Sequence, residues 1–168
     1  GAAQRRGARG GGGRARDPEA PRRTCRGDGA AAARGGARGR TGPGGAREAR
    51  FLFRDPKAEL PVWHGNQLSI LPWGNREGKF RLPKTGWCRR ESLEDGLWRH
   101  LLPEPVEIPA AFGLEKGVWF LIEEGLRGIL VRDEHGDPHV YMLTQPASHY
   151  YQIMTRHSRM PVFIGRQI

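Results

Sequence analysis

Large apolar residues are absent from the first fifty positions of the chain and frequent in the rest. Residues 1–50 contain no Ile, Leu, Val, Met, Phe, Trp or Tyr, whereas residues 51–168 carry one short apolar run after another. A segment without large apolar side chains cannot offset the entropy that its backbone loses on ordering. The pattern therefore predicts a disordered tail over residues 1–50 and a folded domain over residues 51–168.

Within the domain, short apolar runs between turn residues predict strands. Runs at residues 60–63 and 67–71 flank the turn His64-Gly65-Asn66 and predict a hairpin. A further strand is expected over residues 106–110, after a polar loop at 75–85. Three successive strands, expected to pair as an antiparallel meander, follow over residues 117–123, 128–132 and 139–143.

A first helix is expected before the strand at 106–110. Ser92-Leu93-Glu94-Asp95 resembles a capping box, and Leu93, Leu97 and Leu101 follow at helical spacing. These residues predict a short helix near residues 92–102, weakened by Gly96.

A second helix and a closing strand complete the domain. Pro146 is typical of a first helical turn, and the helix over residues 146–156 would turn one apolar stripe to the sheet, namely Ala147, Tyr150, Tyr151 and Met154. The last strand is expected over residues 159–164. The fold class predicted is α+β: a compact, mainly antiparallel β-sheet or barrel-like domain with a few short helices, preceded by the disordered tail.

The positive charge of the chain belongs to the tail. Residues 1–50 hold 13 Arg against four acidic residues, a net charge of +9, while residues 51–168 hold 15 Lys and Arg against 14 Asp and Glu. The formal +10 of the chain therefore does not indicate a basic domain. An Arg/Gly tail can bind phosphate backbones without sequence preference, and a linker or an upstream extension of a GC-rich reading frame has the same composition.

Membrane, disulfide and metal chemistry receive little support from the sequence. The longest uninterrupted apolar run is residues 118–122, so we expect a soluble, cytoplasmic, monomeric protein without a membrane partner. Cys25 lies in the tail and Cys88 in the domain, which does not suggest a disulfide framework. His135 and His139 flank turn residues and are expected to be solvated rather than bound to metal, and no cofactor is expected.

Several stretches, in one order along the chain, resemble the SRAP family, the SOS-response-associated peptidase domain that processes abasic sites in DNA. Tyr141-Met142-Leu143-Thr144, followed by a helix and His157-Ser158-Arg159-Met160-Pro161, resembles the strand, helix and H-x-R-M-P ending of that family. Residues 107–115 are similar to its V-P-A-x-G-x-x-E segment, Trp73-Gly74 to its W-G motif, and Arg89-Arg90-Glu91-Ser92 to its R-x-E-[ST] stretch.

The resemblance implies that Glu115 and His157 are catalytic residues that line a pocket for the abasic sugar. Opening the closed sugar requires a proton taken from the C1 hydroxyl and a proton given to the ring oxygen, which a carboxylate and an imidazole across a cleft can supply. On their residue types alone, Glu115 could equally be a solvated loop residue and His157 part of a basic face.

The chain also departs from the family. Where the family has a cysteine at the second position, which attacks the sugar aldehyde once the initiator Met is removed, this sequence has Ala2. Cys25 lies within the predicted tail, and Trp87 stands where the family has an asparagine. These departures argue against covalent crosslinking to DNA by this chain, and with it against autopeptidase or lyase activity.

Residues around the expected pocket suggest how a DNA strand would be held. Phosphate contacts position a strand without reading its sequence, and four arginines could make them: Arg89, Arg90, Arg156 and Arg159. Trp87 lies in a loop-like context and could stack on an unpaired base, whereas Trp73 is expected in the core. Cys88 is expected to be a buried thiol.

The sequence thus favours a SRAP-like DNA-damage-response domain that binds abasic sites in single-stranded DNA, associated with the bacterial nucleoid when bound. The alternative is a non-enzymatic nucleic-acid-binding protein that acts through its Arg/Gly tail and carries a degenerate SRAP-like domain. A partner-binding domain of a mobile element, with no role on DNA, is a third hypothesis.

Overall fold

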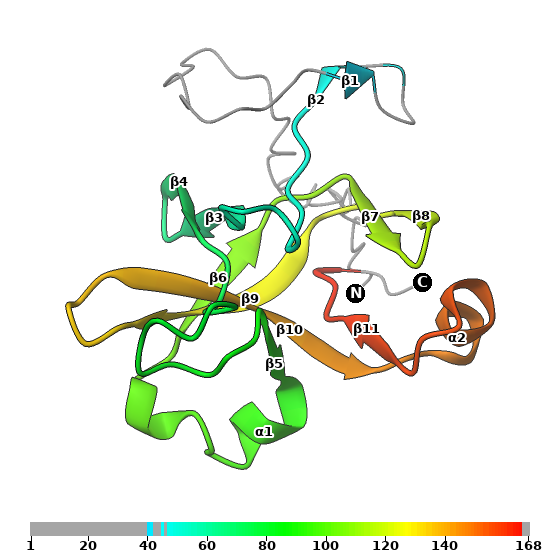
Figure 1. Ribbon diagram of the computed structural model, residues 1–168. Coiled ribbons are helices and arrows are strands. Elements are labelled where there is room, and N and C mark those ends of the chain that lie inside the picture. Colours follow the sequence, from blue (N-terminus) through cyan, green and yellow to red (C-terminus); the bar gives the residue numbers. More distant parts are fainter. Residues whose placement is uncertain (1–39, 42–44, 46, 166–168) are drawn as a thin grey trace, which may run out of the picture. The chain divides into compact units, whose positions relative to one another are not determined.

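A computed structural model describes residues 40–41, 45 and 47–165 of the chain (Figure 1). Strands account for 42% of these residues, and only two short α-helices accompany them. The prediction of a mainly antiparallel β domain with a few short helices is confirmed. The predicted disorder of residues 1–50 falls mostly outside the described residues.

One curled sheet of seven strands forms the body of the domain. Its strand order is β11-β10-β9-β6-β3-β4, all antiparallel, and β5 pairs with β10 in parallel. A single bridge between Trp73 and Val140 brings the end of β4 back to β10. The strands are β3 (Glu59–His64), β4 (Gln67–Pro72), β5 (Trp87–Arg89), β6 (Glu104–Ile108), β9 (Leu126–Arg132), β10 (Pro138–Pro146) and β11 (Arg159–Pro161).

Two small hairpins lie outside this sheet. Among the described residues, strands β7 (Phe112–Glu115) and β8 (Val118–Leu121) pair only with each other. The predicted meander is therefore correct for β9 and β10 but wrong for β8, because the partner of β8 is β7, a strand that the sequence pattern did not predict. Strands β1 (Arg40–Thr41) and β2 (Arg47–Glu48) form the second hairpin, so the described end of the predicted tail carries structure.

The first helical region is shorter than predicted. Helix α1 covers Arg90–Glu94, and a 3₁₀ helix follows at Arg99–Leu101. Gly96 separates them because its φ of +79° lies in the left-handed region. The predicted Ser92 cap is wrong, since the helix begins two residues earlier, after Arg89.

The second helix, α2, covers His149–Thr155. Its N-cap is Ser148, whose side chain accepts a hydrogen bond from the Tyr151 amide, whereas Pro146 ends β10. Tyr151 is buried as predicted, but Tyr150 is 60% exposed and is not part of the packed stripe. No helix in the described ranges is long and apolar enough to span a membrane.

The core has two clusters, because β9 and β10 bury side chains on both faces. Alternate residues of β10 divide between them: Val140 and Met142 join the first cluster, and Tyr141 and Leu143 the second. The first cluster includes Tyr151 of α2 and the buried apolar residues of β3 and β6, while the core residues of β9 divide between the two clusters. The second lies against the α1 region, where Trp98 meets Tyr141 at 5.0 Å between ring centroids.

Candidate functional site

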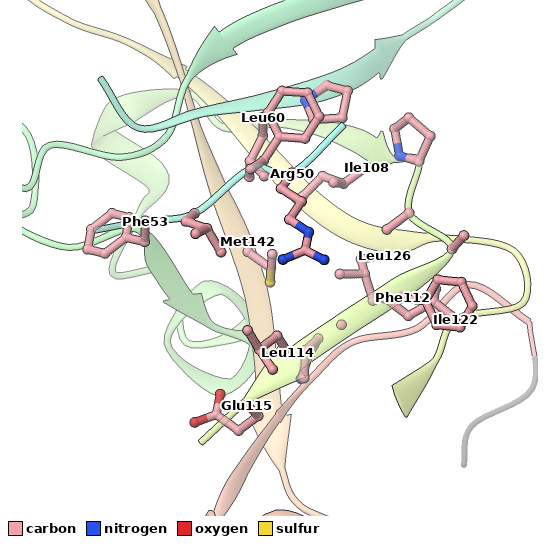
Figure 2. Close-up of a pocket in the computed structure, with 18 of the residues that line it drawn as sticks. Arg50, Phe53, Leu60, Ile108, Phe112, Leu114, Glu115, Ile122, Leu126 and Met142 are labelled. Carbon is pink, nitrogen blue, oxygen red and sulfur yellow. The ribbon is translucent and has the colours of Figure 1, made fainter. Parts of the chain in front are cut away.

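A pocket of about 560 Å³ lies over the first core cluster (Figure 2). Its walls come from residues 48–53, from the stretch 108–115 that includes β7, and from β8. Most of the lining side chains are apolar or aromatic, and the charged ones are Glu48, Arg50 and Glu115. Pockets of this size and character are typical of small-molecule or cofactor sites.

Three aromatic rings make one wall of the pocket. Phe53 lies 5.2 Å from Trp73 and 4.4 Å from Trp87 between ring centroids, and the two tryptophans lie 5.6 Å apart. Trp73 is 8% exposed and its indole N–H donates to the Gly86 carbonyl at 2.8 Å, which confirms the predicted core position. Trp87 is 38% exposed, so part of its ring is open to a ligand.

Glu115 is the last residue of β7 and lines the pocket (Figure 2). It pairs with Val118 across the hairpin and is half-buried. Glu115 is therefore a strand residue, and the alternative interpretation, which placed it in a loop, is wrong on that point. The strand places the carboxylate at the end of the pocket wall.

Arg50 is a pocket residue that the sequence reasoning missed. Its guanidinium reaches into the pocket (Figure 2). The guanidinium carbon also lies 5.2 Å from the centroid of the Trp119 ring. It was assigned to the structureless tail because it precedes the first apolar residues, Phe51 to Phe53. Its position directly before that apolar run was the available signal, since a residue next to a packed segment is ordered with it.

His157 lies in the junction between α2 and β11, as predicted, but it is not among the residues that line the pocket. Its Nδ1 lies 2.9 Å from the Arg159 carbonyl oxygen and 3.2 Å from the Arg159 amide nitrogen. The shorter contact favours a proton on Nδ1, because a carbonyl oxygen only accepts.

The four arginines expected to hold phosphates have different surroundings. Arg89 and Arg156 are exposed, and neither forms an ion pair within the described ranges. Arg90 pairs with Glu94 at 2.7 Å. Arg159 is turned inward, where its two terminal nitrogens donate to both Glu91 oxygens at 2.7 and 2.9 Å and one of them also to the Thr144 carbonyl at 2.8 Å.

The Glu91–Arg159 ion pair should make the stability of the domain depend on pH in the acidic range. Hydrogen bonds from Arg159 lower the pKa of Glu91 from 4.5 to about 2, so the pair stabilises the fold above pH 4.5 and is lost as pH falls toward 2. Glu91→Gln should lower the melting temperature at neutral pH, and its difference from wild type should shrink in acid. Glu94→Gln is the control, because its pair with Arg90 is solvent-exposed. A difference that stays constant down to pH 2 would contradict the assignment.

Cys88 is a buried thiol, as predicted. Its side chain is 0% exposed, and burial raises its pKa to about 12. Since the thiolate is the nucleophile, a thiol held neutral in the core is poorly suited to attack an aldehyde.

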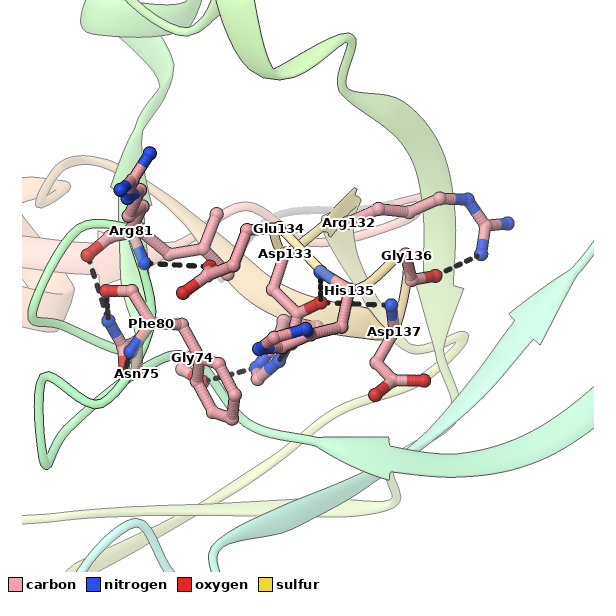
Figure 3. Close-up of polar contacts among 12 residues, drawn as sticks. Gly74, Asn75, Phe80, Arg81, Arg132, Asp133, Glu134, His135, Gly136 and Asp137 are labelled. Atoms are coloured by element: carbon pink, nitrogen blue, oxygen red, sulfur yellow. Dashed lines mark hydrogen bonds and ion pairs between the residues drawn. The ribbon is translucent and has the colours of Figure 1, made fainter.

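A polar network joins the loop at residues 74–81 to the turn between β9 and β10 (Figure 3). Burial alone would raise the pKa of Asp133, but amide donors from His135 and Asp137 and the ring of His139 outweigh it, so the pKa is lowered. His139 Nδ1 donates to the Gly74 carbonyl at 2.9 Å. His139 was expected to be a solvated turn residue, which is wrong, since it lies in β10 and is 3% exposed.

The described residues contain no cluster of three or more His, Cys, Asp or Glu arranged to hold a metal ion. The charged side chains that line the pocket are those of Glu48, Arg50 and Glu115. No family model, curated protein or solved structure matches this chain.

Proposed function

We propose that this chain is a SRAP-like domain that binds abasic sites in single-stranded DNA, with Glu115 and His157 acting on the sugar. The observation that carries the proposal is the pocket of about 560 Å³ with an aromatic wall, one arginine and the carboxylate of Glu115. Residues of three of the motifs that resemble the family contribute to this pocket: Trp73, Glu115 and Pro161. Such a lining suits a sugar with an adjacent unpaired base better than it suits a highly polar small molecule.

The pocket offers each part of an abasic nucleotide a chemically suitable neighbour. A base next to the lesion can stack on Trp87, whose ring is partly open. Arg50 has no ion-pair partner within the described ranges, so its guanidinium can donate hydrogen bonds to a phosphate or sugar oxygen. Glu115 and His157 can then divide the two proton transfers that open the sugar ring.

The proposal predicts a preference for the lesion itself. The full chain should bind a single-stranded oligonucleotide with one abasic site about tenfold or more tightly than the intact strand of the same length, because only the abasic sugar can enter the pocket without its base. Fluorescence anisotropy at fixed salt measures both affinities. Equal, weak binding to the two strands would contradict the proposal.

Intact-mass analysis after incubation with the abasic strand tests for covalent capture. We expect the mass of the chain to remain unchanged, because Cys88 is buried with a raised pKa. An added mass of one oligonucleotide would overturn this expectation, and mapping it would assign Cys25, Cys88 or an amine as the nucleophile.

A further inference from the structure

The turn between β7 and β8 has an unusual residue at its first central position. Lys116 and Gly117 have φ values of +48° and +84°, so both lie in the left-handed region that a type I′ turn requires. Glycine, asparagine and aspartate are the ordinary residues there, because other side chains are unfavourable at positive φ. Lys116 is therefore a poor choice for the turn alone.

A second residue with a left-handed backbone meets the first. Arg156 caps the C-terminus of α2 with φ +56°, at a position where glycine is the usual residue. Lys116 Nζ donates a hydrogen bond to the Arg156 carbonyl oxygen at 2.8 Å. Residues held in such conformations are concentrated at functional sites, where the surrounding structure fixes them.

The contact joins the immediate neighbours of both candidate catalytic residues. Glu115 directly precedes Lys116, and His157 directly follows Arg156. The Lys116–Arg156 hydrogen bond therefore fixes the end of β7 relative to the end of α2. The bond thereby links the backbone next to Glu115 with the backbone next to His157.

Other contacts hold the β7–β8 hairpin at its base rather than at its turn. The hairpin forms no ladder with the seven-stranded sheet within the described ranges. Phe120 of β8 packs on Tyr151 and Phe163, with ring centroids 5.3 and 6.1 Å apart. At the turn itself, the polar contact to α2 is the one that Lys116 makes.

We propose that Lys116 is a positioning residue that sets the Glu115–His157 geometry through the Arg156 carbonyl. This role rests on the proposed function, in which Glu115 and His157 act on the same abasic sugar. In this role, a lysine occupies the turn because its amine can reach the Arg156 carbonyl oxygen, although its backbone conformation is unfavourable.

Lys116→Asn separates the positioning role from a role in folding. Asparagine suits the left-handed turn, so the melting temperature should be unchanged or slightly raised, while the amine is lost. The preference of the full chain for an abasic over an intact strand should fall by about three- to tenfold, because the groups that contact the abasic sugar lose their relative placement. Lys116→Arg, which keeps a cationic donor, should restore most of the preference.

Two further measurements sharpen the test. The carbonyl carbon resonance of Arg156, followed by NMR without DNA, should shift in Lys116→Asn and remain near the wild-type value in Lys116→Arg. Lys79→Asn removes one exposed lysine from outside the pocket and should weaken binding to both strands equally.

Each result decides for or against the role of Lys116. An unchanged Arg156 resonance in Lys116→Asn would show that the bridge does not form, and a shifted resonance with an unchanged preference would make Lys116 a structural residue only. Either outcome overturns the inference while wild type still prefers abasic DNA. Failure of the proposed function is recognised separately, because wild type itself would then bind the two strands equally.

Discussion

Gly74→Ala is expected to destabilise the domain by about 2–5 kcal/mol, a large effect for one methyl group. Gly74 has φ +64°, and a Cβ there would lie 2.0 Å from the Thr85 carbonyl oxygen and 2.6 Å from the Gly86 Cα. Both obstacles are backbone atoms, so no change of rotamer relieves them. Because a domain is ordinarily stable by about 5–15 kcal/mol, the variant would keep little of its stability.

Gly74 also lies at a junction of the hydrogen bonds that support the aromatic wall. Its N–H donates to the Val140 carbonyl at 2.8 Å, and its own carbonyl accepts from His139. The backbone N–H of the next residue, Asn75, donates to the Thr85 carbonyl. A shift of the loop at Thr85 would therefore disturb the bridge to β10 and the wall of the pocket together.

Chemical denaturation of Gly74→Ala and Gly65→Ala measures the steric effect alone. Gly65 has φ +59°, but a Cβ there would meet nothing within 4 Å. Gly65→Ala should therefore cost only the left-handed backbone penalty of about 1–2 kcal/mol. Equal losses in the two variants would mean that the Thr85 and Gly86 backbone yields, contrary to the expectation.

The sequence predicted the strands whose apolar runs are bounded by clear turn residues. The hairpin of β3 and β4 turns at Gly65, and that of β9 and β10 at Gly136, both with positive φ. Local turn chemistry is sufficient in such cases, because it specifies both the turn and the register. The helix α2 was also predicted, with a boundary error of three residues at its start.

Elements whose structure depends on distant partners were missed. Strand β5 is three residues long and exists because Trp87 to Arg89 pair in parallel with β10, more than fifty residues away. Strand β7 contains Gly113, which lowers its apolar signal, yet a Cβ at Gly113 would lie 2.1 Å from the Phe120 ring. The glycine is needed for that close packing, which no local pattern reveals.

At the candidate site, the sequence predicted correctly only those residues whose side-chain type by itself indicates burial. Trp73 was correctly expected in the core, and Cys88 as a buried thiol. The inward position of Arg159 was not predicted, because its partners Glu91 and Thr144 come from other elements. Its function as a phosphate contact stays a prediction, as do those of Arg89, Arg90 and Arg156.

Glu115→Gln and His157→Ala should each lower the rate of sugar opening in a bound abasic strand by about 100-fold. Glutamine cannot take the proton of the C1 hydroxyl, and alanine removes the imidazole that would protonate the ring oxygen. Because the two groups serve one reaction, the double variant should be little slower than the slower single variant. The rate is measured by trapping the open aldehyde with methoxyamine under conditions in which all of the strand is bound.

A second Glu–His pair in the same domain provides the matched control. His64 Nε2 and Glu104 Oε2 lie 2.8 Å apart, with side chains 42% and 43% exposed, on strands that do not line the pocket at these residues. Glu104→Gln and His64→Ala make the same chemical changes and should leave the trapping rate unchanged. Strictly additive losses at Glu115 and His157 would show that they act independently. A loss of the same size at Glu104 or His64 would show that the trapping rate reports general changes in charge or stability rather than chemistry at the pocket.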